Sequence, residues 1–288
     1  MIQKVRDWLR GKSLKPTWEF TTEGIVWRLV PTTIELLVGE ERDIEQRRVS
    51  FFCLDQARGR PLWQKMTFGD QWWVGIEAVH DGVLLLHGFA SPDLPEHRGI
   101  IAVDLKRGQT LWSAQDLAFF ALRGAFLYVT RARGMGVTIL EVDLHTGTLS
   151  RELQADQKLV PGLSPDLPYG VVFPTPIDVQ AEDSEVAALL RRSILNQPAV
   201  GPAEVVQQGN VIIVGYYEQR GTSGEGRPAL DNVLRILDQR SGASIFDVTL
   251  EANVQAVVPD SFFVQNNILL YVKDRQTITA VCLPGHSR

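Results

Sequence analysis

The residues of this sequence that could do chemistry are a few carboxylates and an arginine, set into strand-like stretches. In several places a strand of mixed polarity precedes a strongly apolar strand. We align the strands of mixed polarity by the apolar strands that follow them. The residues at matching positions are then Arg28, Glu77, Phe119 and Glu204, with Asp260 close to the equivalent position. Two carboxylates that flank a glycosidic bond are what hydrolysis requires, and carboxylates with an arginine can hold a sugar or a cation. Half-buried strands also carry polar residues at alternate positions without any function, and this is the interpretation we favour.

The histidines and cysteines predict neither a metal site nor a nucleophile. None of the five histidines forms a pair at metal-ligand spacing on one helix or beside a CxxC motif. His87 and His97 flank one hairpin loop, FASPDLPEHRG, and could approach each other, but we expect them to be ordinary surface residues. No serine lies in a G-x-S-x-G turn, and neither cysteine has a histidine nearby in sequence.

A repeat sets the architecture. An Asp that closes an apolar run is followed four residues later by Gly, and four after that usually by an aromatic residue. The copies are FFCLDQARGRPLW (Asp55, Gly59, Trp63), IIAVDLKRGQTLW (Asp104, Gly108, Trp112), ILEVDLHTGTLSR (Asp143, Gly147, Arg151) and LRILDQRSGASIF (Asp238, Gly242, Phe246). Asp can accept bonds from the backbone that follows and Gly tolerates positive φ, so D-x-x-x-G turns the chain back as a hairpin. The aromatic residue on the returning strand is expected to pack between neighbouring sheets.

Repeats of strand, turn and strand at intervals of tens of residues indicate a β-propeller. A fifth copy, ITAVCLPG, has Cys282 in the place of the Asp and ends before a returning strand, while an isolated strand, TWEF (residues 17–20), stands near the start. We therefore predict five four-stranded blades in one domain over residues 17–288, with the N-terminal strand completing the last blade.

The gap of 95 residues between Asp143 and Asp238 leaves six blades as an alternative. Against a sixth blade, residues 154–202 are rich in proline, which suits no central strand, and contain the helical pattern DSEVAALLRRSIL. Asp183 or Ser184 is a plausible N-cap for that helix. We predict an insertion over 154–202, which could carry a functional lid or a partner surface.

Composition limits the partners and the compartment. The chain has 288 residues, 44% of them hydrophobic, and a net charge of -5, which argues against nucleic acid. Cys53 and Cys282 lie in apolar runs and are expected to be reduced core thiols. No apolar run approaches the length of a membrane span and the start shows no apolar leader, so we expect a cytoplasmic protein with no transmembrane segment.

The repeat resembles the quinoprotein-type (PQQ-like) propeller repeat, which AVDLKRGQTLW matches best and VDLHTG (residues 142–147) matches with its Thr. Quinoproteins that use the cofactor are secreted and have eight blades, so the resemblance implies the fold and we expect no cofactor. The second half, with QQGNVIIVGYYEQ, NVLRILDQRSGASIF and DSFFVQNNILLYVKD, also looks like an uncharacterised bacterial propeller family known only as a domain of unknown function.

The sequence therefore predicts a non-enzymatic propeller scaffold that binds a protein or a small ligand, with a carbohydrate-active hydrolase as the alternative. Expected contacts are the channel mouth with the five aligned residues, the insertion, and a basic N-terminal arm (residues 1–16) around Trp8. Trp72 and Trp73 stand in tandem at the start of the second repeat, and both are partner-surface candidates, because one of two adjacent strand residues must face away from the core. That outward Trp either packs on the next blade or is exposed as a platform for a partner or ligand. The oligomeric state and the identity of any partner are left open.

Overall fold

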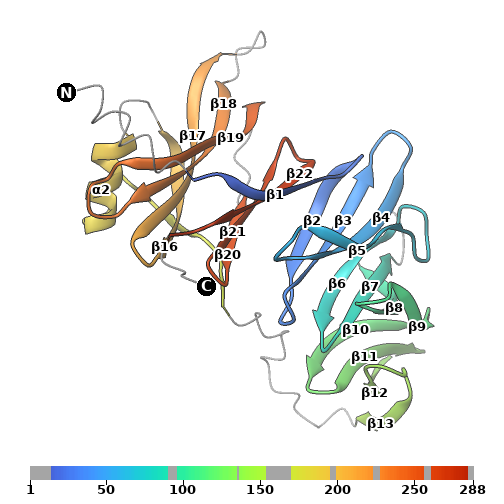
Figure 1. The fold of residues 1–288 in the computed structure, drawn as a ribbon. Coiled ribbons are helices and arrows are strands. Elements are labelled where there is room, and N and C mark those ends of the chain that lie inside the picture. Colours follow the sequence, from blue (N-terminus) through green and yellow to red (C-terminus); the bar gives the residue numbers. More distant parts are fainter. Residues whose placement is uncertain are drawn as a thin grey trace, which may run out of the picture. The chain divides into compact units, whose positions relative to one another are not determined.

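The structure is a computed structural model that describes residues 14–89, 96–134, 136–153, 170–194, 199–222, 228–255 and 261–284. These residues are mostly β-strands, with one α-helix, α2 (Glu185–Ile194) (Figure 1). The described strands form five antiparallel sheets, so the predicted all-β class is confirmed. The chain divides into two compact units, one of Thr22–Tyr169 and one of Met1–Thr21 with Gly170–Arg288.

The unit Thr22–Tyr169 contains three four-stranded sheets, each a meander in which strands adjacent in sequence are adjacent in the sheet. The first sheet consists of β2 (Ile25–Pro31), β3 (Leu36–Asp43), β4 (Arg48–Asp55) and β5 (Arg60–Met66). The second consists of β6 (Val74–His80), β7 (Val83–Phe89), β8 (His97–Asp104) and β9 (Gln109–Ala114). The third consists of β10 (Leu117–Arg123), β11 (Phe126–Arg133), β12 (Gly136–Asp143) and β13 (Leu149–Leu153). Each of these three sheets has the four strands predicted for a blade.

The other unit contains two five-stranded sheets. The fourth sheet runs in the order β15 (Thr175–Ile177), β16 (Ala199–Gln208), β17 (Val211–Thr222), β18 (Pro228–Asp238) and β19 (Ser244–Val254). The fifth runs in the order β1 (Pro16–Thr21), β22 (Thr277–Cys282), β21 (Ile268–Lys273), β20 (Phe262–Gln265) and β14 (Val171–Val172). The N-terminal strand β1 pairs with β22 and so lies in the sheet of the last repeat.

The D-x-x-x-G segments all form the same turn. In each, the Gly amide donates to the carbonyl of the Asp four residues earlier, at 2.8 to 2.9 Å. The Asp carboxylate accepts from one or two backbone amides inside the turn, as Asp104 Oδ1 does from Lys106 and Arg107. A second bond recurs in all five sheets: the amide of the residue after the Asp position donates to the preceding hairpin. Its donors are Gln56, Leu105, Leu144, Gln239 and Leu283. Because Leu283 follows Cys282, the C-terminal copy is a true fifth repeat without its Asp.

The aromatic residue of one repeat packs on the turn of the next. Trp63 in β5 donates from Nε1 to the carbonyl of Leu105 at 2.8 Å, and Trp112 in β9 donates to Leu144 at 2.8 Å. Both indoles lie on the glycine of the turn they reach, and for Trp112 a Cβ on Gly147 would come within 2.6 Å of the ring. The predicted packing of these tryptophans between sheets is confirmed within this unit.

The insertion supplies helix α2 and two short edge strands. Ser184 Oγ accepts from the amide of Ala187 at 3.1 Å, so Ser184 is the N-cap, one of the two residues predicted for it. The helix buries Leu190 and Ile194 against the fourth sheet. Its Ser193 Oγ lies next to the turn glycine Gly242, whereas the turn glycines Gly108 and Gly147 each lie against a tryptophan from the preceding sheet. The short strands β14 and β15 lie at sheet edges, where proline is tolerated. No sixth sheet occurs among the residues that the structure describes.

Two side-chain predictions need correction or qualification. Cys53 is buried in the core between the first and second sheets, as expected, but Cys282 is exposed near the end of its sheet, contrary to the prediction. The Trp8 side chain and most of the N-terminal arm lie outside the described residues.

Among the described residues, no helix is both long and apolar enough to cross a bilayer.

Candidate functional site

The first strand of each sheet in the unit Thr22–Tyr169 carries a β-bulge at the same place. The pairing of β2 with β3, of β6 with β7 and of β10 with β11 skips one residue, and those residues are Trp27, Glu77 and Phe120. The alignment made from the sequence is therefore off by one residue at Arg28 and at Phe119, which are not the equivalents of Glu77. A bulge re-aims the side chain it carries and recurs beside functional sites.

The bulged aromatic residues are exposed. The exposed fraction is 57% for Trp27 and 47% for Phe120, among the largest for apolar side chains of the described residues. Phe119, the residue predicted from sequence, is only half-buried and packs against the apolar cluster between the second and third sheets. Two of the three equivalent bulge positions, Trp27 and Phe120, therefore present an aromatic side chain at the surface, and the third is Glu77.

Charged side chains of the first sheet bind backbone groups at the start of β6 and just before it. Arg42 donates to the carbonyls of Trp72 at 3.1 Å and Val74 at 2.9 Å, while Glu40 Oε2 accepts from the amide of Ile76 at 3.0 Å. Arg28 donates from Nη1 to the carbonyl of Ile76. An unpaired strand edge is a row of free backbone donors and acceptors, so these side chains hold the second sheet against the first. Arg28 therefore has a structural role that its place in the sequence did not reveal.

Arg42 is also the centre of an aromatic group. Its guanidinium forms a 2.7 Å ion pair with Glu40, and its Cζ lies 4.8 Å from the ring centre of Trp72 and 5.4 Å from that of Trp27. Both distances are within the range of a cation–π interaction. Arg42 and Glu40 are both buried. Trp72 and Trp73 precede β6 rather than lying in it, so the prediction that they are adjacent strand residues is wrong. Both side chains are half-buried.

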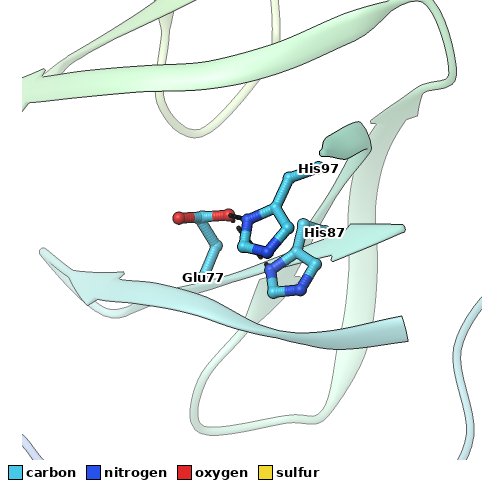
Figure 2. A group of neighbouring side chains, drawn as sticks. All are labelled: Glu77, His87 and His97. Atoms are coloured by element: carbon cyan, nitrogen blue, oxygen red, sulfur yellow. Dashed lines mark hydrogen bonds and ion pairs between the residues drawn. The ribbon is translucent and has the colours of Figure 1, made fainter. Parts of the chain in front are cut away.

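Two histidines and a glutamate converge next to this group (Figure 2). Glu77 comes from β6, His87 from β7 and His97 from β8. One carboxylate oxygen, Glu77 Oε2, lies 2.8 Å from His97 Nδ1 and 3.0 Å from His87 Nδ1. The two imidazole rings are stacked, with centroids 3.5 Å apart and planes 7° apart. The expectation that these histidines are ordinary surface residues is wrong for His87, which is buried.

The two histidines are bound to the carboxylate differently. His97 forms an aligned hydrogen bond with Glu77, whereas His87 Nδ1 is buried and has no hydrogen-bond partner of good geometry in spite of its 3.0 Å ion-pair distance. Burial raises the pKa of the Glu77 carboxyl, but the neighbouring imidazoles of His87 and then His97 outweigh this effect and hold that pKa below its usual value. The carboxylate is therefore ionised at neutral pH and faces a buried nitrogen that is not satisfied.

Aromatic side chains wall this cluster on one side. The ring of Phe89 meets His87 edge-on at 5.2 Å and His97 at 5.5 Å, and Trp73 packs edge-on against Phe89 at 5.8 Å. Gly75 makes room beside His87, because a Cβ there would lie 3.2 Å from His87 Nε2 and 3.3 Å from Glu40 Oε2. The two imidazoles are thus packed against Phe89, and a side chain larger than that of glycine at position 75 would crowd His87.

The last two residues predicted from the sequence, Glu204 and Asp260, do not belong to the described part of the unit Thr22–Tyr169. Glu204 lies on β16 in the other unit, half-buried, where β15 pairs along that strand. Asp260 lies outside the described residues. Analysis of the sequence did not identify four residues of this site, because each of them contacts a different strand and their positions in the chain follow no regular spacing. They are Glu40, Arg42, His87 and His97. The only signal was the pair of histidines flanking one loop.

Comparisons with known proteins are limited. A family model described as a domain of unknown function (DUF4905) matches residues 31–112. This stretch is less than half of the chain, and it includes Glu77, His87 and His97. A comparison with curated proteins finds no match.

Several solved structures are similar to this chain at low identity. A member of the DUF4221 family from Bacteroides vulgatus is 8% identical, with 94% of this chain and 98% of that chain covered and a TM-score of 0.33. Hsv2 from Kluyveromyces lactis is 11% identical, with 90% and 97% covered and a TM-score of 0.30. A quinohemoprotein alcohol dehydrogenase from Pseudomonas putida is 10% identical, with 82% and 44% covered and a TM-score of 0.29, so the chain spans less than half of its length. At these values the sheet topology, and not the likeness, defines the fold.

Proposed function

We propose that this protein is a non-enzymatic binding module built as a five-bladed β-propeller, which contacts another protein through aromatic side chains on the first strands of its blades. The single observation that carries the proposal is the pair of equivalent bulges at which Trp27 and Phe120 project, 57% and 47% exposed. Large exposed aromatic residues are enriched at protein interfaces, where they supply much contact area at little entropic cost.

The polar residues of the same region support binding over hydrolysis. Arg28, Glu40 and Arg42 are engaged with the backbone of β6, and the Glu77 carboxylate is engaged with two histidines. A glycosidase needs two carboxyl groups about 5 to 10 Å apart that are free to reach one sugar. Glu77 is held by two histidines, and Glu40 of the neighbouring sheet is held by Arg42 and by the amide of Ile76, so neither carboxylate is free in this way.

The five repeats support the propeller architecture, because the residue after the Asp position makes the same backbone bond in all five sheets and β1 pairs with β22 in the fifth. Closing a ring of such sheets would remove the exposed edges that isolated sheets leave. Two free cysteines are in keeping with a reducing compartment such as the cytoplasm, which stays part of the proposal.

The experiment compares partners captured from a lysate of the native cell by the tagged wild type, by a Trp27→Ala, Phe120→Ala double variant and by Val137→Ala. Val137 is a matched control because it is 67% exposed in the same unit but lies on β12. We expect one or more partners to be retained by the wild type and by Val137→Ala and lost from the double variant. The same set of captured proteins from all three would contradict the proposal, as would hydrolysis of a glycoside that is lost in Glu77→Gln.

A further inference from the structure

We propose that Glu77, His87 and His97 bind one divalent transition-metal ion of the Zn²⁺ class, independently of the partner surface proposed above. Each residue offers a ligand atom, and these atoms lie within 4.8 Å of one another. Two imidazoles and one carboxylate are a donor set typical of zinc and of neighbouring first-row metals. Three protein ligands leave a coordination position open for water or for a small ligand.

The distances suit such an ion. The contacts of 2.8 and 3.0 Å between Glu77 Oε2 and the two Nδ1 atoms approach the separation of about 3.4 Å between ligands bound at about 2.1 Å in a tetrahedral site. The Glu77 carboxylate brings a negative charge to the cluster, which attracts a divalent cation. The buried Nδ1 of His87, which lacks a well-aligned hydrogen bond, would gain a partner in the ion.

The orientation of the rings predicts a movement on binding. The lone pair of an imidazole nitrogen lies in the plane of the ring, and planes only 7° apart cannot both point at one ion. One ring must therefore rotate and the stack must open. The side chain of His97 is 40% exposed and that of His87 only 7%, so His97 is the ring with room to turn.

The scaffold around the cluster suits a preorganised site. The three ligands come from adjacent strands, Glu77 sits at the bulge of β6, and the register of β7 against β8 shifts directly after His87. Phe89 lies edge-on against both imidazoles and supplies an apolar shell, which limits solvent access and lowers the dielectric constant around a metal site. Ligands carried on strands are positioned more precisely than ligands on loops.

The test uses the full-length protein without any histidine tag, stripped with a chelator and dialysed. Co²⁺ is titrated and followed by visible absorption, and Zn²⁺ is titrated by calorimetry. We expect one ion per chain, with d–d bands of a site containing nitrogen and oxygen ligands. We expect affinity to fall at least about 100-fold in His97→Ala and in Glu77→Gln, because changes to outer-shell partners alone cost about 10- to 100-fold.

His145→Ala is the matched control, since His145 pairs with Asp81 at 3.2 Å in the same unit and is partly exposed. Its affinity for Co²⁺ should equal that of the wild type. Far-ultraviolet circular dichroism checks that each variant is folded, and His97→Ala is preferred to a change at buried His87 for this reason. Absence of binding at one ion per folded chain by the wild type, or equal affinity in His97→Ala, Glu77→Gln and the wild type, would overturn the inference.

Discussion

The indole of Trp63 lies on Gly108 of the next sheet, and a Cβ at Gly108 would come within 2.9 Å of the indole Cγ. Gly108 also has a φ of 65°, in the left-handed region. In Gly108→Ala we expect the free energy of unfolding to fall by about 2 to 4 kcal/mol, from overpacking and from the strained backbone. Urea unfolding followed by tryptophan fluorescence measures the change.

A second glycine, Gly124, distinguishes the effect of the backbone conformation from the effect of the contact with Trp63. Its φ is 56°, but a Cβ there would meet nothing within 4 Å. We expect Gly124→Ala to lose only the backbone contribution of about 1 to 2 kcal/mol. Equal losses in Gly124→Ala and Gly108→Ala would show that the contact with Trp63 contributes nothing.

Arg42→Ala should destabilise the unit Thr22–Tyr169 severely. The change removes the partner of buried Glu40 and leaves the carbonyls of Trp72 and Val74 without the donors that Arg42 provides. Breaking a buried ion pair from one side typically costs about 3 to 5 kcal/mol. Thermal and urea unfolding measure the loss.

The control for Arg42 is Arg58→Ala. Arg58 forms an ion pair with Asp55 at 3.0 Å, but its side chain is 69% exposed. Such surface pairs contribute about 0 to 1 kcal/mol, so little change is expected. A loss for Arg42→Ala no larger than that for Arg58→Ala would contradict the role assigned to Arg42 at the edge of β6.

Glu141 in β12 should make stability depend on pH. It accepts hydrogen bonds from Arg151 at 2.8 Å and from Tyr128 at 2.7 Å, and the bond from Arg151 is the main cause that holds the pKa of Glu141 below its usual value. A lowered folded-state pKa adds stability that is present above the unfolded-state value of about 4.3 and is lost as pH falls through the folded-state value.

Glu141→Gln tests this dependence. We expect the free energy of unfolding of the variant to be about 2 kcal/mol lower than that of the wild type at pH 7, which is the contribution of a hydrogen bond to a charged group. This difference should become smaller at acidic pH, where the Glu141 carboxylate of the wild type becomes protonated. Urea unfolding at pH 7 and at pH 3.5 compares the two. A gap that stays constant or widens in acid would rule out the ionised carboxylate as its source.

The two thiols should react at very different rates. Burial raises the pKa of Cys53 to about 12, so its reactive thiolate is scarce at neutral pH, whereas Cys282 is exposed. With a thiol reagent at pH 8 we expect one fast equivalent from Cys282 and a second only when the protein unfolds. Cys282→Ser should abolish the fast phase, and a fast phase retained in that variant would contradict the assignment.

The sequence by itself determined the features that depend on local chemistry. The D-x-x-x-G turns were predictable because Asp and Gly act on backbone within a few residues of themselves, and the helix over Glu185–Ile194 was predictable from its period and its Ser184 cap. The pairing of β1 with β22 followed from counting strands in the repeat.

Only the tertiary structure decided the candidate site. Each bulge inserts one unpaired residue into a first strand, and since side chains alternate with a period of two, this shifted Arg28 and Phe119 out of register with Glu77. His87 and His97 acquire their chemistry from a carboxylate on another strand. Such contacts depend on strand register and on packing across sheets, which local sequence patterns do not encode.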